Sequence, residues 1–359
     1  DRDGWLAWCG ANRARLFASF RRRVGGGESV KVQSMCTVKT SHTEEVCAQI
    51  SALKAAGCDI VRVSVLDRDD AAAITQIKAQ TGVPLVADIH FSAELAVAAI
   101  EAGCDKVRIN PGNIGGEEKV KLVADCIRAH GIAVRVGSNT GSIERRFLQK
   151  YGVSREALVE SALFSVAMLE KYGVNDIVIS VKASSVPLTY GAYTLLSQRT
   201  DYPLHIGVTE AGTYGSAIVK SSAALGALLL NGIGDTMRVS ITGDPVREAV
   251  AAHEILRAVG LENGFADVIS CPTCGRCMWD SAALAERVTE LVKNVKKPLK
   301  IAVMGCVVNG PGEAAGADIG IAGGNGYCVI FKRGVPAAKV PADEAEEAFI
   351  REIKRLTDG

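Results

Sequence analysis

Four cysteines in the last part of the chain have the residue type and the spacing of metal ligands. Cys271 and Cys274 form a C-x2-C pair, Cys277 follows them, and Cys306 ends the strand-like run LKIAVMGC. Cys271 also follows a strand-like run, DVIS, and thiolates from two strand ends can surround one metal centre. The chain has 11 cysteines in 359 residues, an odd and low number that predicts reduced thiols rather than a disulfide scaffold.

The spacing of these ligands favours iron over zinc. A zinc ribbon needs a second C-x2-C pair, and no histidine follows His253, although Cys277 can supply a fourth thiolate. The sequence also lacks the C-x3-C-x2-C spacing of a radical S-adenosylmethionine site. The glycine-rich NGPGE follows Cys306 and brings Glu313 seven residues beyond it. An iron-sulfur cluster with one carboxylate ligand is therefore the better chemical fit.

Five basic residues lie late in predicted strands, namely Arg62, Arg108, Arg135, Lys182 and Arg238. Residues two apart on a strand share a face, and each of these cations shares its face with a nearby polar residue. In a barrel such side chains converge on the C-terminal mouth, where active sites of that fold are built. Positive charges at this density require an anion, and guanidinium groups match phosphate oxygens, so we predict a phosphate or diphosphate ligand.

Further polar residues are predicted at the same mouth. Asp88 and Glu210 are the expected carboxylate partners of the cations, and Asn139 ends the strand that carries one of them. His90 shares a strand face with Asp88 and is a candidate for proton transfer or for hydrogen bonding to the ligand. Glu210 is a candidate proton donor if it is buried near the anion, and a Schiff base at Lys182 is the less favoured alternative.

A repeated pattern of a helix-like stretch, a glycine and a β-rich run is expected to position these residues. Two copies are nearly identical, AAGCDIVRVS and EAGCDKVRIN. The pattern predicts an α/β protein with a TIM (β/α)8 barrel; a doubly wound open sheet fits less well, because no G-x-G-x-x-G follows the first strand. The predicted strands are 31–36, 58–65, 84–91, 105–111, 133–139, 176–184, 203–210 and 236–242. The glycines expected to end helices are Gly57, Gly103, Gly131, Gly173 and Gly232.

The composition and the repeated pattern of predicted helices and strands change near residue 262. We predict a TIM barrel over 24–262 and a smaller α+β iron-sulfur domain over 263–359, and the status of 1–23 stays open. Lys and Arg total 41 against 40 Asp and Glu, so the net charge of +1 gives no field that attracts nucleic acid or a membrane surface. No apolar run reaches the roughly 18 to 20 residues of a membrane helix, and the sequence predicts a soluble cytoplasmic protein.

An ordered set of motifs closely resembles the bacterial 4-hydroxy-3-methylbut-2-enyl diphosphate synthases of the non-mevalonate isoprenoid pathway. MGCVVNGPGEA is highly specific for that family, and the other motifs become specific as an ordered set. In chain order these are VQSM, DIVRVSV, PLVADIHF, RINPGN, SVKAS, GVTEAG, RVS and CPTC.

The resemblance implies an oxidoreductase with a TIM barrel and an iron-sulfur domain, working as a homodimer in which the cluster domain of one subunit caps the barrel of the other. The implied reaction is the reductive ring opening of 2-C-methyl-D-erythritol 2,4-cyclodiphosphate to 4-hydroxy-3-methylbut-2-enyl diphosphate, with two electrons from flavodoxin or ferredoxin. The implied ligands of a four-iron, four-sulfur (4Fe-4S) cluster are Cys271, Cys274, Cys306 and Glu313. The implied diphosphate-binding residues are Arg62, His90, Arg108, Arg135, Asn139 and Lys182, with Glu210 as the acid.

Two other interpretations stay open. A pterin-dependent or aldolase-type barrel with a structural zinc domain also binds phosphate at its mouth, and in a third interpretation the last domain is an electron-carrying or partner-docking module. Iron with acid-labile sulfide supports the first or the third interpretation, whereas stoichiometric zinc supports the second. The role of Cys277, and whether segment 139–175 is a lid or a helical excursion, also stay open.

Overall fold

The computed structural model describes residues 24–293, 295–308, 312 and 314–358. Segment 1–23 and the predicted ligand Glu313 therefore lie outside the described residues. The chain divides into two compact units between Leu261 and Glu262. Within the described ranges, no helix is both long and apolar enough to cross a membrane.

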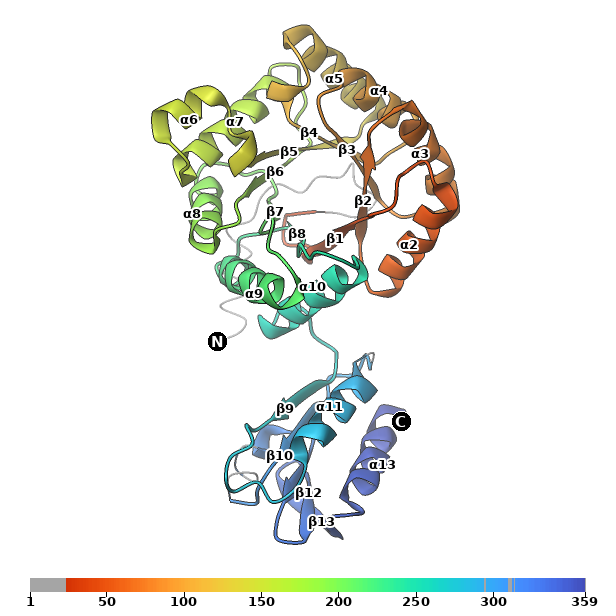
Figure 1. Cartoon of the computed structure of the whole chain (residues 1–359), viewed down its shortest axis with the longest axis vertical. Helices are drawn as coiled ribbons and strands as arrows, with labels where there is room; N and C mark the ends of the chain where they lie inside the picture. Colours follow the sequence, from red (N-terminus) through yellow and green to blue (C-terminus); the bar gives the residue numbers. More distant parts are fainter. Residues whose placement is uncertain (1–23, 294, 309–311, 313, 359) are drawn as a thin grey trace. The chain divides into compact units, whose positions relative to one another are not determined.

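The first unit is a parallel barrel, viewed along its axis in Figure 1. Its strands pair in the order β6-β5-β4-β3-β2-β1-β8-β7, and a parallel bridge from Ile179 to Leu204 brings the two ends of this order together. The predicted TIM barrel is confirmed. The strands are β1 (Lys31–Met35), β2 (Ile60–Val65), β3 (Leu85–Ile89), β4 (Lys106–Ile109), β5 (Ala133–Asn139), β6 (Ile177–Lys182), β7 (His205–Ile206) and β8 (Thr236–Met237).

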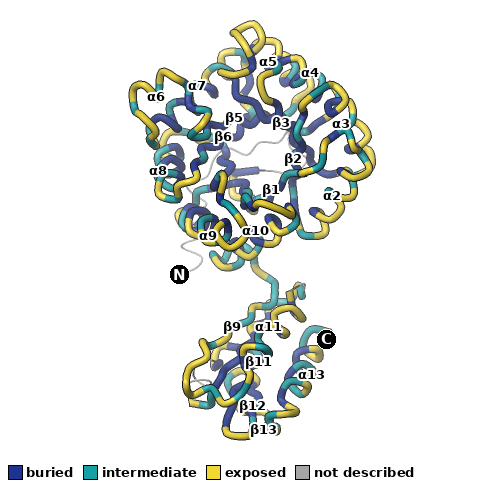
Figure 2. The backbone as a smooth tube through the Cα atoms, viewed as in Figure 1, coloured by how far each residue is buried: buried dark blue, intermediate teal, exposed yellow. Residues whose placement is uncertain are grey.

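Helices surround these strands, and Figure 2 shows the buried strands inside a ring of helices with exposed outer faces. Each of the five predicted helix-ending glycines has a positive φ, the left-handed conformation that this position requires. Segment 139–175 is a helical excursion that includes the 3-10 turn η2 (Thr140–Ser142) and helices α6 and α7. The helices are α2 (Thr43–Ala55), α3 (Arg68–Thr81), α4 (Ala93–Glu101), α5 (Glu117–His130), α6 (Arg145–Tyr151), α7 (Arg155–Glu170), α8 (Val186–Ser197), α9 (Tyr214–Leu230) and α10 (Val246–Ala258), with the 3-10 turn η1 (Pro111–Asn113).

The last two barrel strands are much shorter than predicted, because the runs 203–210 and 236–242 leave the ladder early to approach the barrel mouth. The approach is close at Gly207, where a Cβ atom would lie 2.7 Å from Lys182 Nζ and 2.8 Å from the carbonyl oxygen of Arg238. The residues beyond the ladder include Thr209, which lines the cavity described below. The apolar part of each run was placed correctly, but the polar part that follows it lies at the site and does not extend the sheet.

The second unit is a mixed sheet in the order β13-β12-β11-β10-β9 with two helices on one face. Alternation along β10 sends Ile301 and Val303 to the core under these helices, and Ala302 and Met304 to a smaller cluster on the other face. This is the predicted α+β arrangement. Its elements are β9 (Asp267–Ser270), α11 (Ser281–Val292), β10 (Lys300–Met304), η3 (Ala314–Gly316), β11 (Ile319–Gly323), β12 (Tyr327–Lys332), β13 (Val335–Pro341) and α13 (Ala345–Asp358).

Candidate active site

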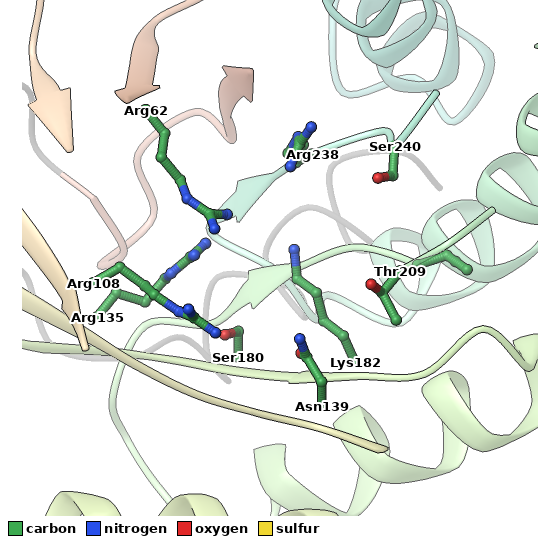
Figure 3. A pocket seen from close by; sticks show the side chains of 10 residues that line it. Arg62, Arg108, Arg135, Asn139, Ser180, Lys182, Thr209, Arg238 and Ser240 are labelled. Atoms are coloured by element: carbon green, nitrogen blue, oxygen red, sulfur yellow. The ribbon is translucent and has the colours of Figure 1, made fainter. Parts of the chain in front are cut away.

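Basic side chains from five strand ends line one cavity of about 120 Å³ in the barrel. Figure 3 shows the side chains of β2, β4, β5 and β6 and of the segment after β8 around a common space. The structure thus brings together all five predicted cations and the predicted amide. The lining residues are Arg62, Arg108, Arg135, Asn139, Ser180, Lys182, Val208, Thr209, Arg238 and Ser240.

The strand register explains why residues distant in sequence meet in this cavity. Asp88 on β3 is the Cα partner of Arg108 on β4, and Arg108 is in turn the partner of Arg135 on β5. Further along the strands, Asn139 on β5 is the partner of Lys182 on β6. Because paired residues of parallel neighbours point to the same face, the register places these side chains side by side inside the barrel.

Asp88 is a buried carboxylate that holds two of the arginines. Arg62 Nη2 donates to Asp88 Oδ2 at 2.5 Å, Arg108 Nη1 donates to Asp88 Oδ1 at 3.2 Å, and His90 Nε2 lies 3.3 Å from Asp88 Oδ2. Burial alone would raise the pKa of Asp88, but Arg62, His90 and Arg108 together hold it well below its usual range. Asp88 therefore stays ionised and fixes the direction of both guanidinium groups.

A second buried carboxylate, which the sequence argument missed, holds Arg238. Glu248 in the first turn of α10 accepts hydrogen bonds from Arg238 Nε at 3.0 Å and from Arg238 Nη2 at 2.9 Å. The expectation that Asp88 and Glu210 are the carboxylate partners of the cations is therefore wrong for Arg238. The partner comes from the helix layer, which the strand parity argument did not consider.

Two of the cations, Arg135 and Lys182, have no carboxylate partner within hydrogen-bond distance among the described residues. Arg135 is buried, and its Nε and Nη1 atoms make no hydrogen bond. Burial, with Arg62 and Arg108 nearby, lowers the pKa of Arg135, and burial with Arg135 and Arg238 nearby lowers that of Lys182. Five cations against the buried carboxylates at 88 and 248 leave an excess of three positive charges, which a bound anion would neutralise.

A second cavity of about 290 Å³ adjoins the first and shares Arg108, Asn139 and Thr209 with it. The second cavity is also lined by His90, Phe91 and Glu210. Phe91 and Glu210 have φ angles of 63° and 52°, which are strained for residues with a Cβ atom and are typical of functional sites. Glu210 is exposed, so the burial that the sequence argument required for a proton donor is not met within the described chain.

In the second unit, the thiols of Cys271 and Cys277 lie close to Gly305, the residue after β10. The backbone N–H of Gly305 donates to Cys271 Sγ at 3.1 Å, and a Cβ atom on Gly305 would lie 2.7 Å from Cys277 Sγ. Cys306 is the next residue in the chain, so β9 and β10 bring Cys271 and Cys306 to the same end of the sheet. Cys277 Sγ lies 3.1 Å from the carbonyl oxygen of Trp279, which gives this thiol a contact within its own loop.

These thiols fit an iron-sulfur cluster in donor chemistry, because thiolates are the usual ligands of such clusters. The ligands are not gathered in advance, since no three His, Cys, Asp or Glu side chains in the described ranges form a metal-binding group. Cys274 is exposed on the turn after β9, and Glu313 lies outside the described residues.

Three polar residues that line the first cavity, Ser180, Thr209 and Ser240, were not predicted as site residues. Ser180 and Ser240 each lie two positions from a predicted cation, so strand alternation was a signal that pointed to both. Thr209 lies in a segment that was predicted as strand, and no pattern in the sequence marked it. Glu248 had a signal of another kind, because it is a charged residue on the apolar face of a helix that buries Ala249, Ala252 and Ile255.

Comparison with known proteins identifies the family. The GcpE TIM-barrel domain matches residues 20–253, and the GcpE protein C-terminal domain matches residues 267–355. This chain belongs to the GcpE family.

GcpE relatives are similar over nearly their whole length. The protein from Caldanaerobacter subterraneus subsp. tengcongensis named 4-hydroxy-3-methylbut-2-en-1-yl diphosphate synthase (flavodoxin) is 52% identical over 336 residues, covering 93% of this chain and 95% of the relative. A protein of the same name from Desulfotalea psychrophila is 51% identical, covering 94% of each chain.

Solved structures support the barrel. A type I 3-dehydroquinate dehydratase from Clostridium difficile is similar with a TM-score of 0.50 and 13% identity, covering 69% of this chain and 97% of that one. At this identity the likeness concerns the fold alone.

Proposed function

We propose that this chain catalyses the two-electron reduction of 2-C-methyl-D-erythritol 2,4-cyclodiphosphate to 4-hydroxy-3-methylbut-2-enyl diphosphate. The observation that carries the proposal is the cavity lined by five cations with two buried carboxylates, in a chain whose near full-length relatives bear the name of this synthase. Guanidinium groups bind phosphate oxygens, and Arg135 lines the cavity without a carboxylate partner among the described residues.

The charge of the cavity suits the charge that the reaction creates. With its phosphates ionised, the cyclic substrate is a dianion; two electrons and one proton convert it to the linear diphosphate trianion and water. The bond between carbon and the bridging phosphate oxygen breaks, and the new charge remains on that oxygen. A cavity with three excess positive charges stabilises this developing charge more than the substrate dianion, which is the requirement for electrostatic catalysis.

The proton that leaves with the hydroxyl group as water needs a donor near the cavity. Asp88 cannot serve, because Arg62 and Arg108 hold it as a carboxylate, and the oxygens of Glu248 already accept hydrogen bonds from Arg238, Ser34 and Ile241. Glu210 lines the adjoining cavity with His90, and this cavity shares Arg108, Asn139 and Thr209 with the cationic one. Glu210 is the proton donor in this proposal.

Cys271, Cys274 and Cys306, with Glu313 as the fourth ligand, would hold the 4Fe-4S cluster that the family resemblance implies. Such a cluster, when bound, accepts and passes on electrons one at a time. The hydrogen bond from Gly305 N–H to Cys271 Sγ supports this assignment, since hydrogen bonds to cluster sulfurs tune the reduction potential.

The electron donor, the oligomeric state and the location are also part of the proposal. The names of the relatives specify flavodoxin, so flavodoxin is the proposed electron donor. The homodimer rests on the family resemblance, and the cytoplasmic location rests on the sequence argument.

Metal analysis and one variant test this function. Protein purified without oxygen should contain iron and acid-labile sulfide at about four per chain, as a 4Fe-4S cluster requires. Stoichiometric zinc without sulfide would instead support the pterin-dependent or aldolase-type alternative, which the names of the relatives do not favour.

Glu210→Gln should lower kcat by on the order of 10² to 10⁴, the usual contribution of a positioned acid, with unchanged cluster absorbance. Glu101→Gln, an exposed change at the end of α4, is the matched control and should leave kcat unchanged. Full turnover by Glu210→Gln would remove this residue from the role.

A further inference from the structure

Glu248 is one of the few carboxylates buried in the barrel unit, and it accepts hydrogen bonds from residues near the barrel mouth. Its side chain accepts from Ser34 Oγ at 2.7 Å and from the backbone N–H of Ile241 at 3.1 Å, besides the two bonds from Arg238. Glu248 is 2% exposed. The carboxylate thus ties β1, the segment after β8 and the first turn of α10 to a single guanidinium group.

The two bonds to Arg238 form a fork, because Nε and Nη2 lie on one edge of the guanidinium plane. A bidentate pair of this kind fixes the orientation of the plane as well as its position. Arg238 Nη1 lies 3.8 Å from Met35 Sδ, and Arg238 is one of the residues that line the cavity. Arg238 is therefore oriented before any ligand arrives, which avoids an ordering cost on binding.

We propose that Glu248 is a positioning residue: it orients Arg238 so that the guanidinium group meets a diphosphate oxygen. The role rests on the proposed function and deepens it. Glu248 holds Arg238 as Asp88 holds Arg62 and Arg108, so three of the four arginines are bound by carboxylates that do not line the cavity.

The direction in which pyrophosphate affinity changes in Glu248→Gln distinguishes a positioning role from a simple charge effect. Glu248→Gln removes a negative charge, which by electrostatics alone would tighten the binding of an anion. Its amide N–H groups would also face the N–H groups of Arg238, donor against donor, so the fork would be lost. Positioning therefore predicts weaker binding of inorganic pyrophosphate to the anaerobic holoenzyme, by about tenfold or more.

A double-mutant cycle with Arg238→Gln tests whether Glu248 acts through that arginine. In the Arg238→Gln background, Glu248→Gln should cause no further loss of pyrophosphate affinity or of kcat/KM. Ser34→Ala keeps the carboxylate but removes one of its hydrogen bonds, and should weaken pyrophosphate binding two- to fivefold by the same route. This milder variant carries the test if Glu248→Gln does not fold.

The matched control is Asp235→Asn, another buried carboxylate, which accepts from Leu204 N at the opposite end of β8. It should lower the melting temperature and leave pyrophosphate affinity unchanged. Unchanged or tighter binding in Glu248→Gln, or a loss that adds fully to that of Arg238→Gln, would overturn the proposal. The pyrophosphate measurement also tests this proposal independently of the proposed function. An absence of turnover in the unmodified protein would refute the synthase activity, but not the role of Glu248 in pyrophosphate binding.

Discussion

Arg135 is a buried cation that pairs with no carboxylate among the described residues, and such a group costs stability unless a ligand neutralises it. Arg135→Met should therefore stabilise the unliganded protein by about 1–3 kcal/mol, a few degrees in melting temperature. The same change should abolish the stabilisation that pyrophosphate gives the unmodified protein.

Thermal unfolding with and without pyrophosphate measures both effects of Arg135→Met. Arg199→Met is the control, because Arg199 pairs with Glu160 at the surface, and there a change should stay within about 0.5 kcal/mol. A less stable Arg135→Met variant that still responds to pyrophosphate would contradict this account of the cavity.

Lys106, at the start of β4, is fully buried, and burial lowers its pKa to about 7. Below about pH 7, Lys106 is charged in both the folded and the unfolded state. Between about pH 7 and pH 10 it is neutral in the folded state and still charged in the unfolded state. The unfolded chain then binds the extra proton, so stability should rise with pH across this window, by a few kcal/mol.

Denaturant unfolding of the unmodified protein and of Lys106→Met at several pH values tests this expectation. The variant should lose the part of the pH dependence that lies between about pH 7 and pH 10. Parallel curves for the two proteins would show that Lys106 does not titrate there.

At the scale of elements, the loop after β10 depends on a residue without a side chain, Gly305. Gly305→Ala would place a Cβ atom against Cys277 Sγ while Gly305 N–H bonds to Cys271 Sγ, so the loop before Cys306 should shift. We expect Gly305→Ala to lower iron and sulfide per chain severalfold. Adding Cys277→Ala should restore much of both, because it removes the atom that the new methyl group meets.

Iron and sulfide analysis of the single and double variants gives the result, with Cys277→Ala alone as the control. Loss of iron in Cys277→Ala alone would instead indicate that Cys277 binds the cluster, which is the alternative that the spacing of the cysteines left open.

The elements also show how far sequence reasoning reaches. Strand alternation placed all five cations at one mouth, because the positions of side chains along a strand are set locally. The lengths of β7 and β8 were wrong, since the approach of Gly207 to Lys182 and Arg238 is a tertiary contact. Glu248 was missed for the same reason: its partner lies on another element, and only packing of α10 on the barrel brings the two together.

At the scale of the whole molecule, each of the two compact units carries one of the two groups of residues that the proposed reaction needs. The barrel unit supplies the cationic cavity, and the second unit supplies the thiols at the ends of β9 and β10. The fold of each unit followed from the sequence, because each has its own hydrophobic core and its own pattern of elements. The assignment of Glu313 as a ligand stays a prediction, since this residue lies outside the described part of the chain.

The measurement that tests the central claim most directly is anaerobic turnover of the cyclic diphosphate, followed by phosphorus NMR with reduced methyl viologen as the electron source. The account predicts one linear diphosphate product for every two electrons consumed, and no product with Lys182→Met, which loses a cavity cation while its iron and sulfide stay in place. Failure of the cluster-loaded protein to consume the cyclic diphosphate, or equal turnover by Lys182→Met, would contradict the account.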